Sequence, residues 1–164
     1  MTLLDPDILL NVLIDERVEF IVVGGLAAVM QGATLTTFDL DIVPRLDPAN
    51  IERLERALVA LDARFRARPD LAPQRSHLVS RGHKLLRTRA GDLDVLGAIG
   101  DDEDYDDLRS DVVEISWDDL VVPVLGLHGL IRTKRAVGRN KDLLAIPILE
   151  RLVAISHRTS EGDE

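Results

Sequence analysis

Residues 20–43 read FIVVGGLAAVMQGATLTTFDLDIV, and this stretch decides the fold. Its first four residues are aromatic or β-branched, which predicts a short buried strand that ends in a tight turn at Gly24-Gly25. The small apolar residues 26–31 predict a short helix, and the segment 39–43 predicts a second strand. A strand, a glycine turn, a helix and a second strand in this order favour a sheet with helices packed against it.

The remainder of the chain predicts further elements around this unit. The Asp-Pro pairs at 5–6 and 47–48 each begin a helix, because aspartate caps a helix and proline suits its first turn. The stretches 67–81 and 101–107 are polar and predict loops. Strands are expected at 83–89, 92–96, 112–117 and 121–124, and helices at 127–137 and 140–155. The predicted fold class is α/β (α+β): a mixed sheet of about five strands with helices packed on it, plus C-terminal helices.

The chain length of 164 residues predicts one domain rather than two. We expect this domain to span residues 1–157, with a core at about 18–97. C-terminal strands and helices are expected at about 110–157. The polar residues 158–164 predict a disordered tail.

Composition excludes several classes of function. The net charge is −9, so the chain lacks the broad positive surface with which proteins grip nucleic acid. Aromatic residues make up 3% of the chain, which disfavours base stacking on aromatic platforms. Cysteine is absent, which excludes thiolate metal sites and a cysteine nucleophile. Without a positively charged leader or a long apolar segment, we expect a cytoplasmic protein that makes no membrane contact.

Asp39 and Asp41 stand two residues apart on a predicted strand. Side chains alternate along a strand, so both carboxylates lie on one face while Leu40 and Ile42 lie on the other. Adjacent carboxylates repel each other, and a hard divalent cation such as Mg²⁺ removes that cost. The alternative is an edge strand with two solvated aspartates.

Asp92 and Asp94 repeat this pattern after Gly91. If their strand lies beside the first, Asp94 completes a cluster of three carboxylates, whereas Asp92 suits the turn. The alternative is a hairpin with turn chemistry only. At Gly24-Gly25 the backbone N–H groups could approach a phosphate closely, although such a pair is more often only a turn.

Three motifs occur in a characteristic order: VGG at 23–25, DLD at 39–41 and LDV at 93–95. Over residues 18–97 this order resembles the minimal nucleotidyltransferase superfamily, which has the DNA polymerase β-like fold. The resemblance implies transfer of a nucleoside monophosphate (NMP) from an NTP, with release of pyrophosphate. It also implies a two-metal Mg²⁺ site.

The resemblance assigns roles to individual residues. Asp39, Asp41 and Asp94 are the implied catalytic residues and metal ligands, with Asp94 also orienting or deprotonating the acceptor hydroxyl. Gly24 and Gly25 are the implied nucleotide-binding turn.

The segment 129–142 is similar to the Lys…Gly-Arg-x-Lys-Asp segment of small prokaryotic nucleotidyltransferase-like proteins, including relatives of abortive-infection toxins. This similarity implies that Lys134, Arg139 and Lys141 bind the nucleotide or an RNA acceptor. The alternative is a solvated helix end whose cations offset the helix dipole. Those relatives often carry arginine at the position of Leu35, where it would neutralise charge or hold phosphate.

Two functions follow from these observations. The first is a Mg²⁺-dependent, ATP- or other NTP-binding nucleotidyltransferase that acts on an RNA, protein or small-molecule hydroxyl. It could belong to a toxin–antitoxin pair and so bind a cognate antitoxin or other partner protein. The second is a catalytically inactive protein of the same fold that binds a nucleotide or a protein partner, an alternative that Leu35 favours. A DNA-binding antitoxin is disfavoured by the charge.

Overall fold

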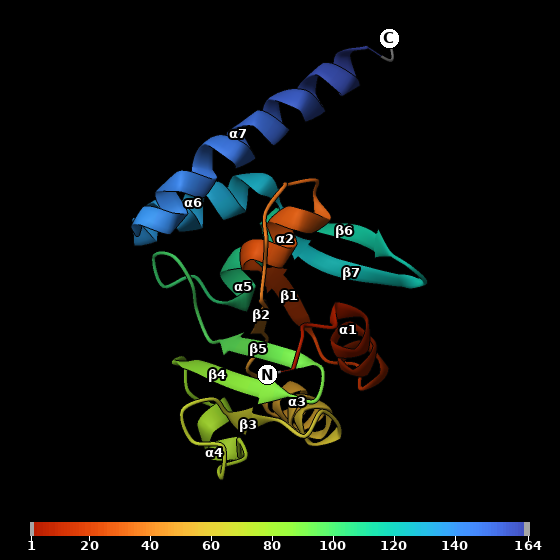
Figure 1. The fold of residues 1–164 in the computed structure, drawn as a ribbon, viewed down its shortest axis with the longest axis vertical. Helices are drawn as coiled ribbons and strands as arrows, with labels where there is room; N and C mark the ends of the chain where they lie inside the picture. The colour runs from red at the N-terminus through yellow and green to blue at the C-terminus, as the bar shows by residue number, and fades with distance from the viewer. Residues whose placement is uncertain (1, 163–164) are drawn as a thin grey trace.

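The computed structural model describes residues 2–162 and shows a mixed α/β architecture (Figure 1). Its strands are β1 (Phe20–Val23), β2 (Asp39–Pro44), β3 (Arg64–Phe65), β4 (His83–Thr88), β5 (Gly91–Leu96), β6 (Val112–Trp117) and β7 (Leu120–Leu125). Its helices are α1 (Pro6–Asp15), α2 (Gly24–Met30), α3 (Pro48–Ala60), α4 (Arg75–Leu78), α5 (Tyr105–Leu108), the 3₁₀ turn η1 (Arg109–Asp111), α6 (Leu127–Val137) and α7 (Asn140–Glu161).

The strands form one mixed sheet in the order β3-β4-β5-β2-β1-β7-β6. Strand β2 runs parallel to β5 and antiparallel to β1, and β1 runs parallel to β7. The sheet therefore has seven strands within the described residues, and the prediction of about five was wrong. The shortest strand, β3, has two residues and no alternating pattern, so only its pairing with β4 reveals it.

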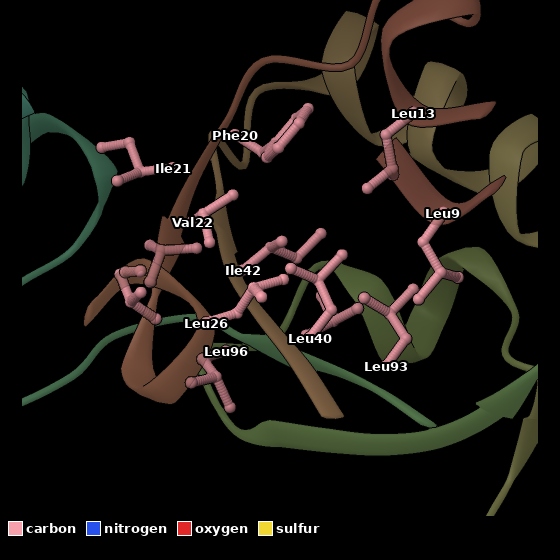
Figure 2. Close-up of a cluster of buried hydrophobic side chains, with 14 of the residues drawn as sticks. Leu9, Leu13, Phe20, Ile21, Val22, Leu26, Leu40, Ile42, Leu93 and Leu96 are labelled. Carbon is pink, nitrogen blue, oxygen red and sulfur yellow. The ribbon is translucent and has the colours of Figure 1, made fainter. Parts of the chain in front are cut away.

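A large part of the hydrophobic core lies on the face of the sheet opposite Asp39 and Asp41. Leu40 and Ile42 of β2 are fully buried there together with Leu93 of β5 (Figure 2). Helices α1 and α3 contribute further buried leucines, among them Leu9 and Leu54. Burying one full-sized aliphatic side chain contributes roughly 1.5–3 kcal/mol, so this face fixes which side of β2 the aspartates take.

Two polar side chains, those of Asp5 and Asn50, fix the start of α1 and the attachment of α3. The Asp5 side chain caps α1 by accepting a hydrogen bond from the backbone N–H of Ile8 at 3.2 Å. Asn50 of α3 is fully buried and bonds both the N–H and the carbonyl of Glu19, at 2.7 and 2.8 Å. A third bond, at 2.7 Å, reaches the carbonyl of Arg45. Asn50 therefore joins α3 to the segments that enter β1 and leave β2.

The C-terminal helices follow the predicted break. Gly138 ends α6 with a left-handed φ of +69°, which suits glycine. Helix α7 continues to Glu161, so residues 158–161 of the segment predicted as a tail are helical. Residues 163–164 of that segment lie outside the described residues. Figure 1 shows the last turns of α7 extending away from the sheet. None of the described helices combines the length and the apolar character that crossing a membrane requires.

Candidate functional site

Three carboxylates from two neighbouring strands meet on the face of the sheet opposite Leu40 and Ile42. The parallel register of β2 and β5 pairs Asp41 with Asp94 and Asp39 with Asp92. One carboxylate oxygen from each of Asp39, Asp41 and Asp94 lies within 4.8 Å of the other two. The expected cluster of three carboxylates is therefore present. Asp92 lies outside it, two residues before Asp94 on β5 and opposite Asp39.

Burial and mutual repulsion govern the electrostatics of this cluster. The pKa of Asp41 is raised from 3.8 to about 8, first by burial and then by the charges of Asp39 and Asp94. Burial also raises the pKa of Asp39, with Asp94 as the next cause. Carboxylates that repel each other at such short range favour either a shared proton or a bound cation.

The donor set fits a divalent cation. It consists of carboxylate oxygens alone, which are the ligands that Mg²⁺ prefers, and it is open enough to leave coordination positions for water or phosphate. Asp94 is 9% exposed, and Asp39 and Asp41 are half-buried, so the cluster is reachable from solvent. Among the described residues, no other group of histidines or carboxylates converges in this way.

Gly24 makes room for Asp41. Its φ is +70°, a conformation that residues with a Cβ rarely adopt, and a Cβ placed there would overlap the Oδ2 atom of Asp41. Gly25 is close to Thr37, whose Oγ1 would lie 3.2 Å from an added Cβ. Helix α2 begins at Gly24 itself, two residues earlier than predicted. The glycine pair thus has a structural reason to exist that is separate from any phosphate.

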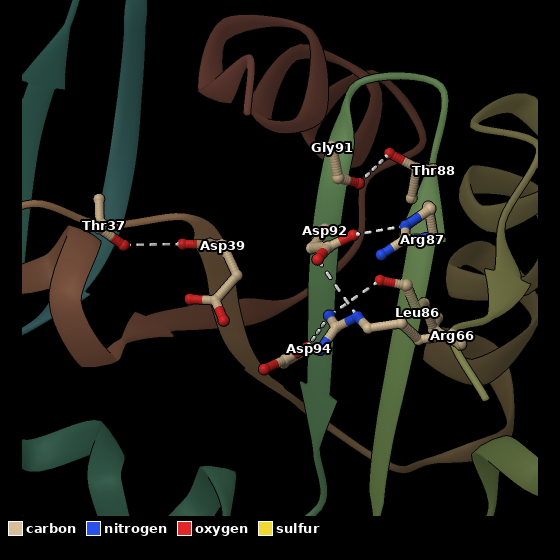
Figure 3. A network of polar contacts seen from close by, with 9 residues as sticks. All are labelled: Thr37, Asp39, Arg66, Leu86, Arg87, Thr88, Gly91, Asp92 and Asp94. Carbon is tan, nitrogen blue, oxygen red and sulfur yellow. Dashed lines mark hydrogen bonds and ion pairs between the residues drawn. The ribbon is translucent and has the colours of Figure 1, made fainter. Parts of the chain in front are cut away.

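Arg66 is a site residue that the sequence did not reveal. It follows β3, and its Nη2 donates to Asp94 Oδ1 at 2.7 Å and to the carbonyl of Leu86 at 3.1 Å (Figure 3). Its Nε lies 3.2 Å from Asp92 Oδ2. The sequence shows only one arginine among several in an irregular stretch, because the two residues of β3 are too few to form a recognisable strand pattern.

The basic segment divides into two groups. Lys134 and Arg139 both form ion pairs with the buried Asp142, at 3.7 and 2.8 Å. Lys141 is different, because its positive charge partly offsets the rise in the pKa of Asp39 and Asp41 that burial and the neighbouring carboxylates cause. The charge of Lys141 therefore acts on the carboxylates without an ion pair to them among the described residues, whereas Asp142 pairs with the other two predicted cations.

The position of Leu35 gives no charge to the site. Its side chain is partly buried and packs against the hydrophobic core. Arg66 instead brings a positive charge to one carboxylate of the cluster, that of Asp94, from the segment that follows β3.

Comparisons with known proteins identify the fold. No protein-family model and no curated protein matches the chain. Among solved structures, a putative nucleotidyltransferase from Thermotoga maritima matches with a TM-score of 0.51 and 18% identity, over 98% of this chain and 97% of that one. The antibiotic-resistance factor ANT(2'')-Ia matches with a TM-score of 0.61 and 14% identity, over 96% and 92% of the two chains. At these identities the similarity establishes a nucleotidyltransferase-like fold, as the three motifs predicted.

Proposed function

We propose that the protein is a Mg²⁺-dependent nucleotidyltransferase that transfers an NMP from an NTP to a hydroxyl of an RNA, a protein or a small molecule. One observation carries the proposal. Three carboxylates from two strands that are distant in the sequence, β2 and β5, form an oxygen-only cluster in a nucleotidyltransferase-like fold. Their mutual repulsion gives them an affinity for a divalent cation that isolated surface aspartates lack.

The three aspartates have different tasks in this proposal. Asp39 and Asp41, adjacent on one strand, would hold Mg²⁺ where it meets the triphosphate, and Asp94 would share a second ion. Bound metal would supply charge neutralisation at the phosphates and at the attacking and leaving oxygens. Asp94, on the neighbouring strand, orients the acceptor hydroxyl and takes its proton.

The transfer balances as a single displacement. The acceptor oxygen forms a bond to the α-phosphorus, the bond from that phosphorus to the bridging oxygen of the β-phosphate breaks, and pyrophosphate leaves. The hydroxyl proton passes to the carboxylate of Asp94. Catalysis of this kind rests mainly on positioning and electrostatics, which rigid neighbouring strands provide.

Nucleotide binding is proposed at the rim of the same cluster. Gly24 lies beside Asp41 and Gly25 beside Thr37, and neither glycine carries a side chain that would block a phosphate. Lys141 adds a positive charge that acts on the carboxylates. We place Lys134 and Arg139 in the same role, with Asp142 as the residue that holds them in position.

Incubation of the protein with each labelled NTP, Mg²⁺ and either total RNA or lysate protein tests the proposal. We expect label on a macromolecule or small acceptor from the wild type and none from Asp39→Ala. Asp70→Ala is the matched control, because Asp70 is exposed and pairs only with Arg68 within the described residues. Nucleotide binding without any transfer would replace the proposal with the inactive alternative, which Leu35 favours.

The C-terminal resemblance supports a finer proposal, that the enzyme is the toxin of a toxin–antitoxin pair. This predicts that expression of the wild-type chain arrests growth and that expression of Asp39→Ala does not. Equal growth with both chains would remove the toxin assignment and leave the transferase assignment in place.

A further inference from the structure

The polar contacts beside the carboxylate cluster form a short chain that joins β4, β5 and the residue after β3. Arg87 of β4 lies 3.2 Å from Asp92, Asp92 lies 3.2 Å from the Nε of Arg66, and Arg66 donates to Asp94 at 2.7 Å. Figure 3 shows this chain approaching Asp94 from the β4 side, whereas Asp39 lies on the other side of β5. Arg66 therefore stands behind Asp94 as seen from the cluster.

The two oxygens of Asp94 have separate surroundings. Oδ1 accepts the hydrogen bond from Arg66. The second oxygen points away from Arg66, toward the strand that carries Asp39 (Figure 3). An arginine that occupied the cation position would contact all three carboxylates, but the ion pairs of Arg66 are with Asp92 and Asp94.

Arg66 is itself held rigidly. Its backbone N–H donates to the carbonyl of Leu85 at 2.9 Å, and its Nη2 donates to the carbonyl of Leu86 at 3.1 Å. The preceding residue, Phe65, packs edge-on against His77 with the ring centroids 4.9 Å apart. The side chain of Arg66 is 27% exposed, so its position is fixed by these contacts more than by solvent.

We propose that Arg66 is a positioning residue, which fixes one oxygen of Asp94 so that the other faces Asp39 and Asp41 and completes the metal site. This inference rests on the proposed function, because it assigns Arg66 a task only if the cluster binds a divalent cation. A hydrogen bond that orients a ligand typically contributes 10–100-fold to metal affinity. Without Arg66, the carboxylate of Asp94 is free to rotate, and the third ligand is lost for much of the time.

Electrostatics alone makes the opposite prediction. Arg66 is a cation close to the site, so a purely Coulombic role would repel a metal, and its removal would strengthen binding. The sign of the change in affinity therefore separates a positioning role from a simple charge effect.

The test measures Mn²⁺ binding by electron paramagnetic resonance at neutral pH, without nucleotide, for wild type, Arg66→Met and Arg66→Lys. We expect Arg66→Met to weaken Mn²⁺ binding about tenfold or more and Arg66→Lys to restore part of that loss. Arg64→Met is the control, since Arg64 is exposed, lies two residues earlier and pairs with Asp62 outside the cluster. It should bind Mn²⁺ as the wild type does.

A double-mutant cycle shows whether Arg66 acts through Asp94. In an Asp94→Asn background, Arg66→Met should cause no further loss of affinity. Far-ultraviolet circular dichroism and urea unfolding confirm that each variant is folded, so a loss of affinity is not a loss of structure.

The outcomes separate this inference from the proposed function. Unchanged or tighter binding by Arg66→Met, or an equal loss in the Asp94→Asn background, would overturn the positioning role while leaving the metal site intact. Absence of Mn²⁺ binding by the wild type would overturn both.

Discussion

Replacing Asp41 by asparagine should stabilise the metal-free protein at high pH. Asp41 has its pKa raised from 3.8 to about 8 by burial and by the charges of Asp39 and Asp94. The folded chain therefore keeps a proton at Asp41 that the unfolded chain has released over most of this interval. By linkage, the free energy of unfolding falls as pH rises from about 4 to about 8. The stability that the protonated Asp41 contributes is fully present below its unfolded pKa of 3.8 and is lost as the pH rises through its folded pKa of about 8.

The size of the effect follows from the same pKa values. Each pKa step corresponds to about 1.4 kcal/mol, so the full interval corresponds to at most about 6 kcal/mol. Relaxation and water entry recover part of the cost of a buried charge, so we expect a net gain of about 2–5 kcal/mol for Asp41→Asn above pH 8. Asparagine has nearly the same shape as the protonated carboxyl group, so the fit of Asp41 beside Gly24 is kept.

Urea unfolding in EDTA at pH 5 and pH 9 measures this difference. The wild type should lose stability between the two pH values, and Asp41→Asn should lose markedly less. Addition of Mg²⁺ at pH 9 should restore the wild type and leave the variant unchanged. If Asp41→Asn were the less stable protein at pH 9 in EDTA, the cluster would not be the electrostatic burden that its geometry implies.

Three further predictions concern the same residues and their supports. Mn²⁺ affinity, measured calorimetrically, should increase between pH 6 and pH 8, because the proton on Asp41 competes with the metal; a flat profile would contradict the raised pKa. Gly24→Ala should lower the free energy of unfolding by at least ~2 kcal/mol in urea titrations, since it combines a left-handed φ with overlap on Asp41; a neutral effect would show that the turn readjusts. Asn50→Ala should lower the free energy of unfolding by about 2–4 kcal/mol, because it leaves the buried backbone groups of Glu19 and Arg45 unpaired. Its Mn²⁺ affinity should equal that of the wild type; a loss of affinity in the folded variant would link α3 to the site.

The parts of the fold that could be predicted are those with a strong local pattern. The alternation in 39–43 put Leu40 in the core and the aspartates on the other face, and the structure confirms this arrangement. Gly138 marked the break between α6 and α7, because glycine readily adopts the left-handed conformation that ends α6. These features depend on a few neighbouring residues, so one sequence is enough to reveal them.

The parts that could not be predicted depend on tertiary contacts. Strand β3 and helix α4 lie in or beside the polar stretch expected to be a loop, and each has four residues or fewer. Arg66 reaches Asp94 only because β3 pairs with β4, which has no local signature. The polar run 101–107 similarly contains the start of α5, which Asp104 caps by accepting from the N–H of Asp107.

The candidate site shows the same division. The place of Asp94 in the carboxylate cluster could be predicted because it lies inside an apolar run, and an apolar strand of this kind pairs with another strand of the core. The pairing of Asp142 with both Lys134 and Arg139 becomes visible only in the folded chain, as does the action of the Lys141 charge on the carboxylates.

The most direct test of the central claim is anomalous diffraction from crystals grown with Mn²⁺ and a non-hydrolysable NTP analogue. The account predicts anomalous peaks between the carboxylates of Asp39, Asp41 and Asp94, with the triphosphate of the analogue completing the coordination. A nucleotide bound elsewhere, or three carboxylates with no anomalous density between them, would contradict it.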